Sequence, residues 1–212
     1  MSLKVADVLA TLNDRVTQGM FFWVGSTYVN ANDYNAVRDN ILNGNIMVLD
    51  GKPDQTLAFY NAKTDILTTQ NATPPADVGQ RALLLHECTH ALVDYANNGY
   101  VTRHLNELAA YFAQVVYMAR SMPGWTMPDN PDPKWAAFFH GVFDMVKDCR
   151  LDSLDGNGAG LDSDKLEPLR VQLAALPGVD YSGYAKDTPA GSDGVFQYGP
   201  IASAVRRKLS GL

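Results

Sequence analysis

The sequence contains little glutamate, histidine or cysteine. Of the 23 acidic residues in this chain of 212, 20 are Asp and only three are Glu. Four histidines are present, at positions 86, 90, 104 and 140. Most of the glutamates and histidines lie in one short stretch, namely His86, Glu87, His90, His104 and Glu107. This clustering is the first indication of a functional site.

Long apolar runs are also absent. No uncharged stretch reaches the roughly 18–20 residues that a membrane-spanning helix needs. Asp7 and Asp14 interrupt the layout of a secretory signal, and two cysteines, Cys88 and Cys149, are too few for a disulfide framework. We therefore expect no membrane partner and, by default, a cytoplasmic protein, with export by a non-classical route left open.

Positive charge is scarce as well. The chain has 17 Lys and Arg residues against 23 acids, a net charge of -6. Its densest basic cluster, at 206–208, is too short for the phosphate-neutralising surface of a nucleic-acid binder. Hydrophobic residues make up 46% of the chain and charged ones 19%, which is typical of a globular protein. The composition predicts one folded domain over 1–212 and no nucleic-acid partner.

The spacing of apolar residues predicts a mostly helical α+β fold with three parts. The N-terminal part, 1–76, is expected to contain helices and a small, mostly antiparallel sheet. The second part, 77–150, carries the helices discussed below, and 151–212 is rich in loops. The N-terminal part has expected helices over 3–18 and from Asp33 to about 42, and expected strands at 45–49, 56–60 and 65–69. The apolar run 20–24 is left undecided.

Three longer helices are expected in the second part. The first begins after Pro74-Pro75, where Asp77 and Gln80 form a capping-box pattern, and ends at 97–99. The second runs from about Thr102 to 121, and the third from about 132 to 149. Beyond them we expect a short helix at 164–176 capped by Asp164 and Glu167, a loop over 177–200 and a last helix at 200–209.

Residues 86–90 read His-Glu-Cys-Thr-His, an HExxH motif within the first of these helices. Positions four apart share one helix face, so His86 and His90 can present two imidazoles to one metal ion while Glu87 lies beside them. Zinc accepts imidazole and carboxylate ligands, and a catalytic zinc keeps one position for water. Such a water loses its proton readily to a nearby carboxylate. The motif therefore predicts one zinc ion and metal-assisted hydrolysis, with Glu87 as general base.

The third ligand is expected on the following helix. Glu107 comes 17 residues after His90, in an otherwise apolar segment. If the two helices are antiparallel, Glu107 returns to the metal, and the small Ala110 one turn on permits close approach. The alternatives are a solvated carboxylate at 107 and, for the motif, a core helix with two buried histidines. The second alternative is unfavourable because buried polar groups need partners.

These residues resemble the zincin metallopeptidases of the gluzincin type, in which HExxH is followed by a ligand Glu on a later helix. The resemblance covers residues from about 56 to 121. It implies zinc ligands at His86, His90 and Glu107, a general base at Glu87, and a peptide or protein substrate. It also implies a zincin-like domain with a sheet before the motif helix, whose edge strand pairs with an extended substrate. The HxxGxxH continuation of the metzincins is absent.

Other candidates surround this motif in the sequence. Asp94, one turn after His90, is a candidate partner for an imidazole N–H. The transition state needs a donor for the developing oxyanion, and the candidates are His140, paired with Asp144, and Tyr111. His104, Tyr181 and Tyr184 are further candidates.

Two functions follow from the sequence. The leading one is a zinc-dependent metallopeptidase. The alternative is a zinc-binding, catalytically silent interaction or effector-type protein with a closed site. The sequence indicates neither the substrate specificity nor the oligomeric state.

Overall fold

The computed structural model describes residues 3–25, 27–51, 58–69, 77–97, 101–127, 132–148, 159–161 and 163–176. These residues form seven helices and six strands in a mixed α+β arrangement, so the predicted fold class is confirmed. The expected loop 177–200, the expected helix 200–209 and Cys149 lie outside them. Within the described part of the chain, no helix combines the length and apolar character needed to cross a membrane.

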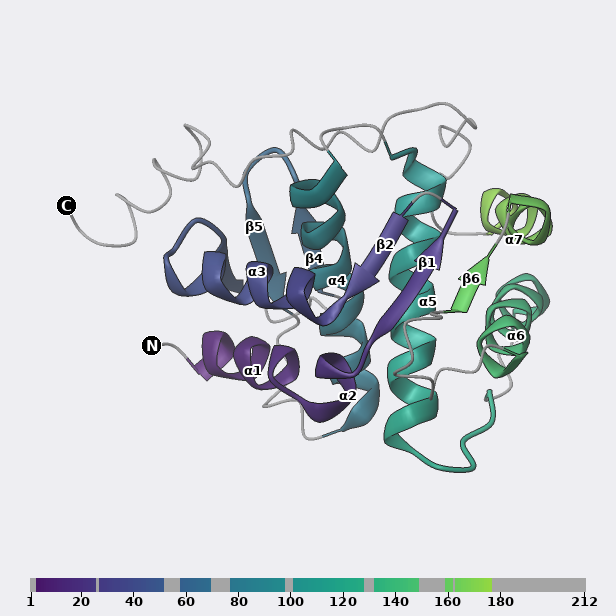
Figure 1. The fold of residues 1–212 in the computed structure, drawn as a ribbon, viewed down its shortest axis with the longest axis horizontal. Coiled ribbons are helices and arrows are strands. Elements are labelled where there is room, and N and C mark those ends of the chain that lie inside the picture. Colours follow the sequence, from purple (N-terminus) through teal and green to yellow (C-terminus); the bar gives the residue numbers. More distant parts are fainter. Residues whose placement is uncertain are drawn as a thin grey trace.

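Two long helices, α4 (Val78–Asn97) and α5 (Arg103–Ser121), form the centre of the molecule. They lie side by side, and the chain runs in opposite directions along them (Figure 1). Asp77 Oδ1 accepts a hydrogen bond from the backbone N–H of Gln80 at 2.7 Å, which satisfies a donor at the start of α4. Both predicted helices are confirmed, and they have the antiparallel arrangement that the expected third ligand requires.

The other helices flank this pair on two sides (Figure 1). On one side lie α1 (Leu3–Leu12), α2 (Arg15–Gln18) and α3 (Ala31–Leu42). On the other lie α6 (Pro133–Asp148) and α7 (Ser163–Ala174). Helix α3 begins at Ala31, before the predicted Asp33, because Asn30 and Asp33 form its capping box. Buried apolar side chains from α1 and from α3 through α7 join in one core cluster, and Val16 of α2 packs against it.

The expected capping box at the start of α7 is wrong. The helix begins at Ser163, so Asp164 lies inside it and Glu167 is in its second turn. The Glu167 carboxylate instead accepts a hydrogen bond from Arg170 Nε at 2.8 Å, one turn further on.

The strands form two three-stranded sheets, where the sequence predicted one mostly antiparallel sheet. The first has the order β2 (Thr27–Asn30), β1 (Phe21–Val24), β6 (Ala159–Leu161). β1 and β2 form an antiparallel hairpin whose turn begins at Gly25, with a left-handed φ of 57°. β6 pairs with β1 in parallel. The undecided run at 20–24 is thus a strand.

The second sheet has the order β3 (Met47–Asp50), β5 (Ile66–Thr69), β4 (Phe59–Asn61). β4 and β5 form an antiparallel hairpin across residues 62–65, while β3 pairs with β5 in parallel. Strand β4 is at the edge of this sheet and contacts α4, which carries the HExxH motif. The second sheet therefore has the place that the sequence predicted for a sheet on the motif helix.

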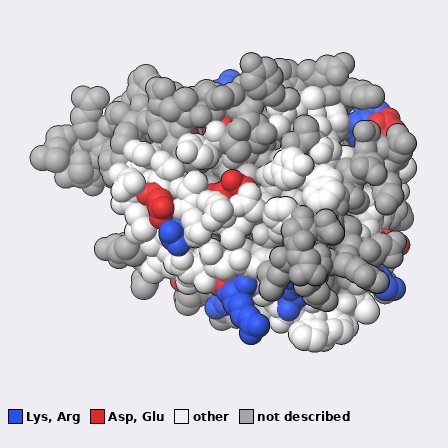
Figure 2. Space-filling model, viewed as in Figure 1, with Lys and Arg blue, Asp and Glu red and all other residues white. Residues whose placement is uncertain are grey.

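Charged side chains are dispersed on the face drawn in Figure 2. Among the described residues, lysines and arginines lie there in small separate groups, without a continuous basic surface.

Candidate metal centre

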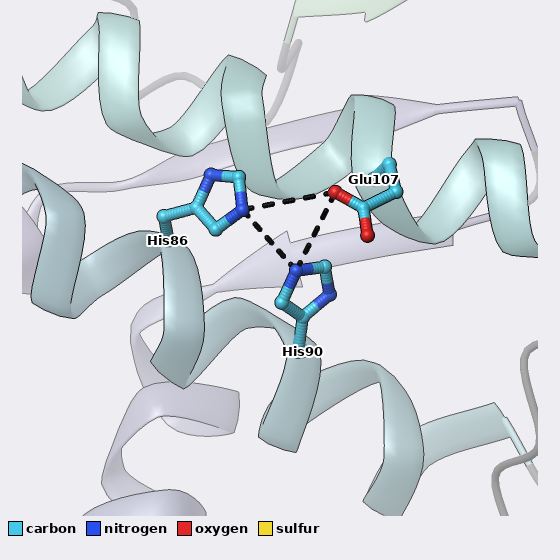
Figure 3. A group of neighbouring side chains, drawn as sticks. All are labelled: His86, His90 and Glu107. Atoms are coloured by element: carbon cyan, nitrogen blue, oxygen red, sulfur yellow. Dashed lines mark hydrogen bonds and ion pairs between the residues drawn. The ribbon is translucent and has the colours of Figure 1, made fainter. Parts of the chain in front are cut away.

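The two motif histidines converge from one face of α4. His86 and His90 are one turn apart, and their Nε2 atoms lie 3.2 Å from each other (Figure 3). The rings meet edge to face, with centroids 4.9 Å apart. In metal-free protein this separation requires one imidazole to donate to the other, whereas two neutral imidazoles with both Nε2 lone pairs facing inward can hold a cation.

Glu107 completes the group from α5 (Figure 3). Its Oε2 lies 3.8 Å from His86 Nε2 and 3.7 Å from His90 Nε2. Given these separations, a point equidistant from the three atoms lies about 2.1 Å from each, which matches Zn–N and Zn–O bond lengths of about 2.0–2.2 Å. Nitrogen and oxygen donors in this arrangement fit a zinc ion. The proximity predicted from the sequence is confirmed.

The centre is mostly buried and keeps a small exposed area. The His86 side chain is 6% exposed, His90 13% and Glu107 17%. Burial and the charge of His90 hold the pKa of His86 well below its ordinary value, so His86 is neutral, which is the ligand form. Burial acts to lower the pKa of His90 as well, but the charges of Glu107 and Glu87 together with the Asn106 hydrogen bond outweigh it and raise that pKa. A proton therefore competes with a metal ion mainly at His90.

Asn106 orients His90. Its Oδ1 lies 2.8 Å from His90 Nδ1, so this nitrogen donates and Nε2 is left to face the centre. The sequence suggested Asp94 for this place, but the structure gives it to Asn106. Asp94 is buried and accepts a hydrogen bond at 2.8 Å from the hydroxyl of Tyr60 on β4.

Gln114 lies next to the ring of His86, on α5. Its amide raises the pKa of His86 and thereby opposes the effect of burial. The two side chains do not form a hydrogen bond, because His86 Nδ1 and Gln114 Oε1 are both buried without a hydrogen-bond partner.

Glu87 is buried on α4 next to this centre. Its Oε2 accepts a hydrogen bond from the backbone N–H of Tyr60 at 2.8 Å. Burial raises the pKa of Glu87 to about 7; the charge of His90 and the Tyr60 N–H oppose this shift, and the charge of Glu107 adds to it. A carboxyl with this pKa exchanges a proton readily near neutral pH.

The structure separates the two oxyanion candidates. The ring of Tyr111, one turn after Glu107, meets the ring of His86 edge to face with centroids 4.5 Å apart. On its other side Tyr111 packs against aromatic residues of α6, namely Trp135, Phe138 and Phe139. His140 is exposed on α6. Among the described residues, it does not belong to the group formed by His86, His90 and Glu107. Tyr181 and Tyr184 lie outside the described residues.

The sequence reading missed Asn106, Gln114 and Tyr60. A signal existed for the first two, because both are polar residues in the apolar helix that carries Glu107. Gln114 lies two turns after Glu107 on the same face, and Asn106 precedes Glu107 directly. No comparable signal marked Tyr60. Its backbone N–H donates to Glu87 only because the pairing of β4 with β5 places the strand beside α4.

Comparisons of the chain with protein-family models, with curated proteins and with solved structures find no match.

Proposed function

We propose that this protein binds one zinc ion through His86, His90 and Glu107 and hydrolyses peptide bonds, in the manner of the gluzincin-type metallopeptidases that its motif resembles. The observation that carries the proposal is the convergence of two imidazole nitrogens and one carboxylate oxygen on one point, beside the buried carboxyl of Glu87. Three protein ligands leave a fourth position of a tetrahedral ion for water, as in catalytic zinc sites.

A zinc ion held here would lower the pKa of its bound water towards about 7 and polarise the scissile carbonyl. Glu87 would accept the proton of that water and pass it to the leaving amine. Burial raises the pKa of Glu87 in the metal-free chain, and the charge of a bound zinc ion would lower it, which favours the ionised form that accepts a proton. His86 and His90 serve as neutral ligands, and Asn106 of α5 orients His90.

The substrate proposed is an extended peptide or protein segment. Strand β4 lies at the edge of its sheet and meets the centre through the Tyr60 N–H. An edge strand can pair with an added strand through main-chain hydrogen bonds, and here the pairing would use main-chain groups other than the Tyr60 N–H, which donates to Glu87. Phe59, on the opposite face of β4 from Tyr60, is 52% exposed and offers an apolar surface to a substrate side chain.

Tyr111 is the proposed donor to the developing oxyanion. Its ring contacts a ligand histidine and is held by three aromatic side chains of α6, so its position is defined by packing. A phenol hydroxyl fixed next to the metal could donate to negative charge that forms on the carbonyl oxygen.

The test compares unmutated protein with Glu87→Gln. Zinc content is measured by elemental analysis after purification with ample metal, and cleavage is measured on a mixture of internally quenched peptides of random sequence. We expect about one zinc per chain in both proteins and hydrolysis only in the unmutated one, with a loss of 10²–10⁴-fold in Glu87→Gln. Protein without zinc would contradict the proposal. Zinc in both proteins and cleavage in neither would instead assign the chain to the zinc-binding, catalytically silent class.

A further inference from the structure

Tyr60 contacts helix α4 at two points that are two turns apart. Its backbone N–H donates to Glu87 Oε2 at 2.8 Å, and its side-chain hydroxyl donates to Asp94 Oδ2 at 2.8 Å. The two acceptors are seven positions apart, which corresponds to a rise of about 10 Å along a helix. Tyr60 therefore lies along the helix, with its backbone at the candidate base and its hydroxyl two turns away.

The hydroxyl end is held from a second direction. Asp65, at the start of the β5 side of the hairpin, has Oδ1 3.1 Å from the Tyr60 hydroxyl. Asp65 and Asp94 are each 2% exposed and Tyr60 is 7% exposed, so this cluster is secluded from water. Burial, followed by the charges of Asp94 and Asp65, raises the pKa of Tyr60 far above its ordinary value, which keeps the hydroxyl protonated as a donor.

The backbone end lies on the outer edge of β4. Tyr60 is opposite Leu67 of β5, yet its N–H points to Glu87. Residues of an antiparallel pair alternate between facing the partner strand and facing away from it, and Tyr60 faces away. Without an anchor, an N–H on a short edge strand would have no fixed position relative to α4.

We infer that Tyr60 is a positioning residue for Glu87: the hydrogen bonds of its hydroxyl to Asp94 and Asp65 fix β4 on α4, so that the Tyr60 N–H holds Oε2 of the carboxylate and leaves Oε1 for proton transfer. This inference rests on the proposed function, in which Glu87 is the general base. Among the described residues Tyr60 contacts none of the three proposed zinc ligands. Its role is thus separable from metal binding.

The chain offers a matched control. Tyr34 on α3 is also fully buried, and its hydroxyl forms a hydrogen bond of 2.8 Å with Thr89 Oγ1 on the same helix α4. Tyr34→Phe and Tyr60→Phe each remove one buried phenol hydroxyl that binds α4, but only Tyr60 also contacts Glu87. A difference between the two variants therefore reports the connection to Glu87 and not a general loss of stability.

The experiment has two readouts. The first is kcat and KM on the quenched peptide mixture, with the zinc affinity measured by competition against a chromophoric chelator. We expect kcat to fall about tenfold in Tyr60→Phe through lost positioning, with KM within about twofold and zinc affinity within about threefold. Tyr34→Phe should keep the kcat of the unmutated protein, while its melting temperature falls about as much as that of Tyr60→Phe.

The second readout needs no activity. In zinc-free protein, hydrogen exchange of the residue 60 amide is followed by NMR. This amide should exchange at least about tenfold faster in Tyr60→Phe than in Tyr34→Phe, because its bond to Glu87 opens more often. Equal kcat and equal exchange in the two variants would overturn the inference. Zinc-loaded unmutated protein that cleaves nothing would overturn the proposed function instead, and the exchange rates would still decide whether Tyr60 anchors Glu87.

Discussion

His90 Nδ1 lies 2.8 Å from Asn106 Oδ1, and Asn106 directly precedes Glu107 on α5. One turn of α5 therefore supplies both a proposed metal ligand and the side chain that orients another ligand. The ring of His90 cannot rotate without breaking this bond, so its Nε2 stays directed at Glu107 and His86. The two central helices are coupled at the centre by this contact.

Removing the orienting amide should weaken metal binding without abolishing it. Asn106→Ala is expected to lower zinc affinity about 10–100-fold, the usual effect of losing an outer partner of a ligand histidine. Asn106→Asp keeps an acceptor at the same place and should restore most of the affinity. Chelator competition measures all three affinities. Equal affinity in Asn106→Ala and the unmutated protein would contradict the assignment.

Glu107 and Glu167 form a natural pair for testing the third ligand. Glu107→Ala removes a proposed zinc ligand, whereas Glu167→Ala removes an exposed carboxylate that binds Arg170. Zinc that binds only the folded state raises the melting temperature. We expect zinc to raise it in unmutated protein and in Glu167→Ala, and to have little effect in Glu107→Ala. An equal rise in both variants would exclude Glu107 as a ligand.

The raised pKa of Glu87 makes a prediction about the stability of zinc-free protein. Burial raises this pKa from an ordinary value of 4.5 to about 7. The folded state therefore binds the Glu87 proton more tightly than the unfolded chain does, so the contribution is fully present below about pH 4.5 and is lost as the pH rises to about 7. Glu87→Gln carries no such proton.

The corresponding measurement is the free energy of unfolding of both proteins between pH 5 and 8, by denaturant titration without metal. The free energy of unfolding of Glu87→Gln, relative to that of the unmutated protein, should increase with pH. The increase is at most about 3 kcal/mol, because one pKa unit corresponds to about 1.4 kcal/mol. Groups that titrate alike in both proteins cancel in the difference, whereas His90 contributes to it because the charge of Glu87 raises the pKa of His90. A difference independent of pH would mean that Glu87 has an ordinary pKa in the fold.

Tyr111 can be tested by separating its ring from its hydroxyl. Tyr111→Phe keeps the edge-to-face contact with His86 and the packing on α6. If the hydroxyl stabilises the oxyanion, kcat should fall about 10²–10³-fold with zinc content unchanged. Tyr111→Leu should in addition weaken zinc binding, because it removes the ring against His86. Full activity in Tyr111→Phe would limit Tyr111 to a packing role.

Much of the centre could be predicted because it depends on local periodicity. The four-residue spacing of His86 and His90 places them on one helix face whatever the rest of the chain does. Their proximity to Glu107 needed only that two consecutive helices run in opposite directions, which the short connection between them favours. The composition added weight, since two of only three Glu residues lie beside the histidines.

The features that could not be predicted depend on long-range pairing. β6 pairs with β1 across more than a hundred residues, and its three-residue segment lies in a stretch rich in Asp, Gly and Ser that reads as loop. The bond from Tyr60 to Glu87 likewise requires the register of a sheet against a helix. Asp94 illustrates the same limit: spacing placed it one turn from His90, but β4 supplies its partner, Tyr60.

The most direct test of the account is an anomalous difference map recorded at the zinc absorption edge from crystals of the zinc-loaded protein. We predict one peak, about 2.0–2.2 Å from His86 Nε2, His90 Nε2 and a Glu107 carboxylate oxygen, with a water molecule as the fourth ligand within reach of Glu87. The absence of a peak at these atoms would contradict the proposed metal centre. A fourth position filled by a protein side chain would contradict the proposed hydrolysis.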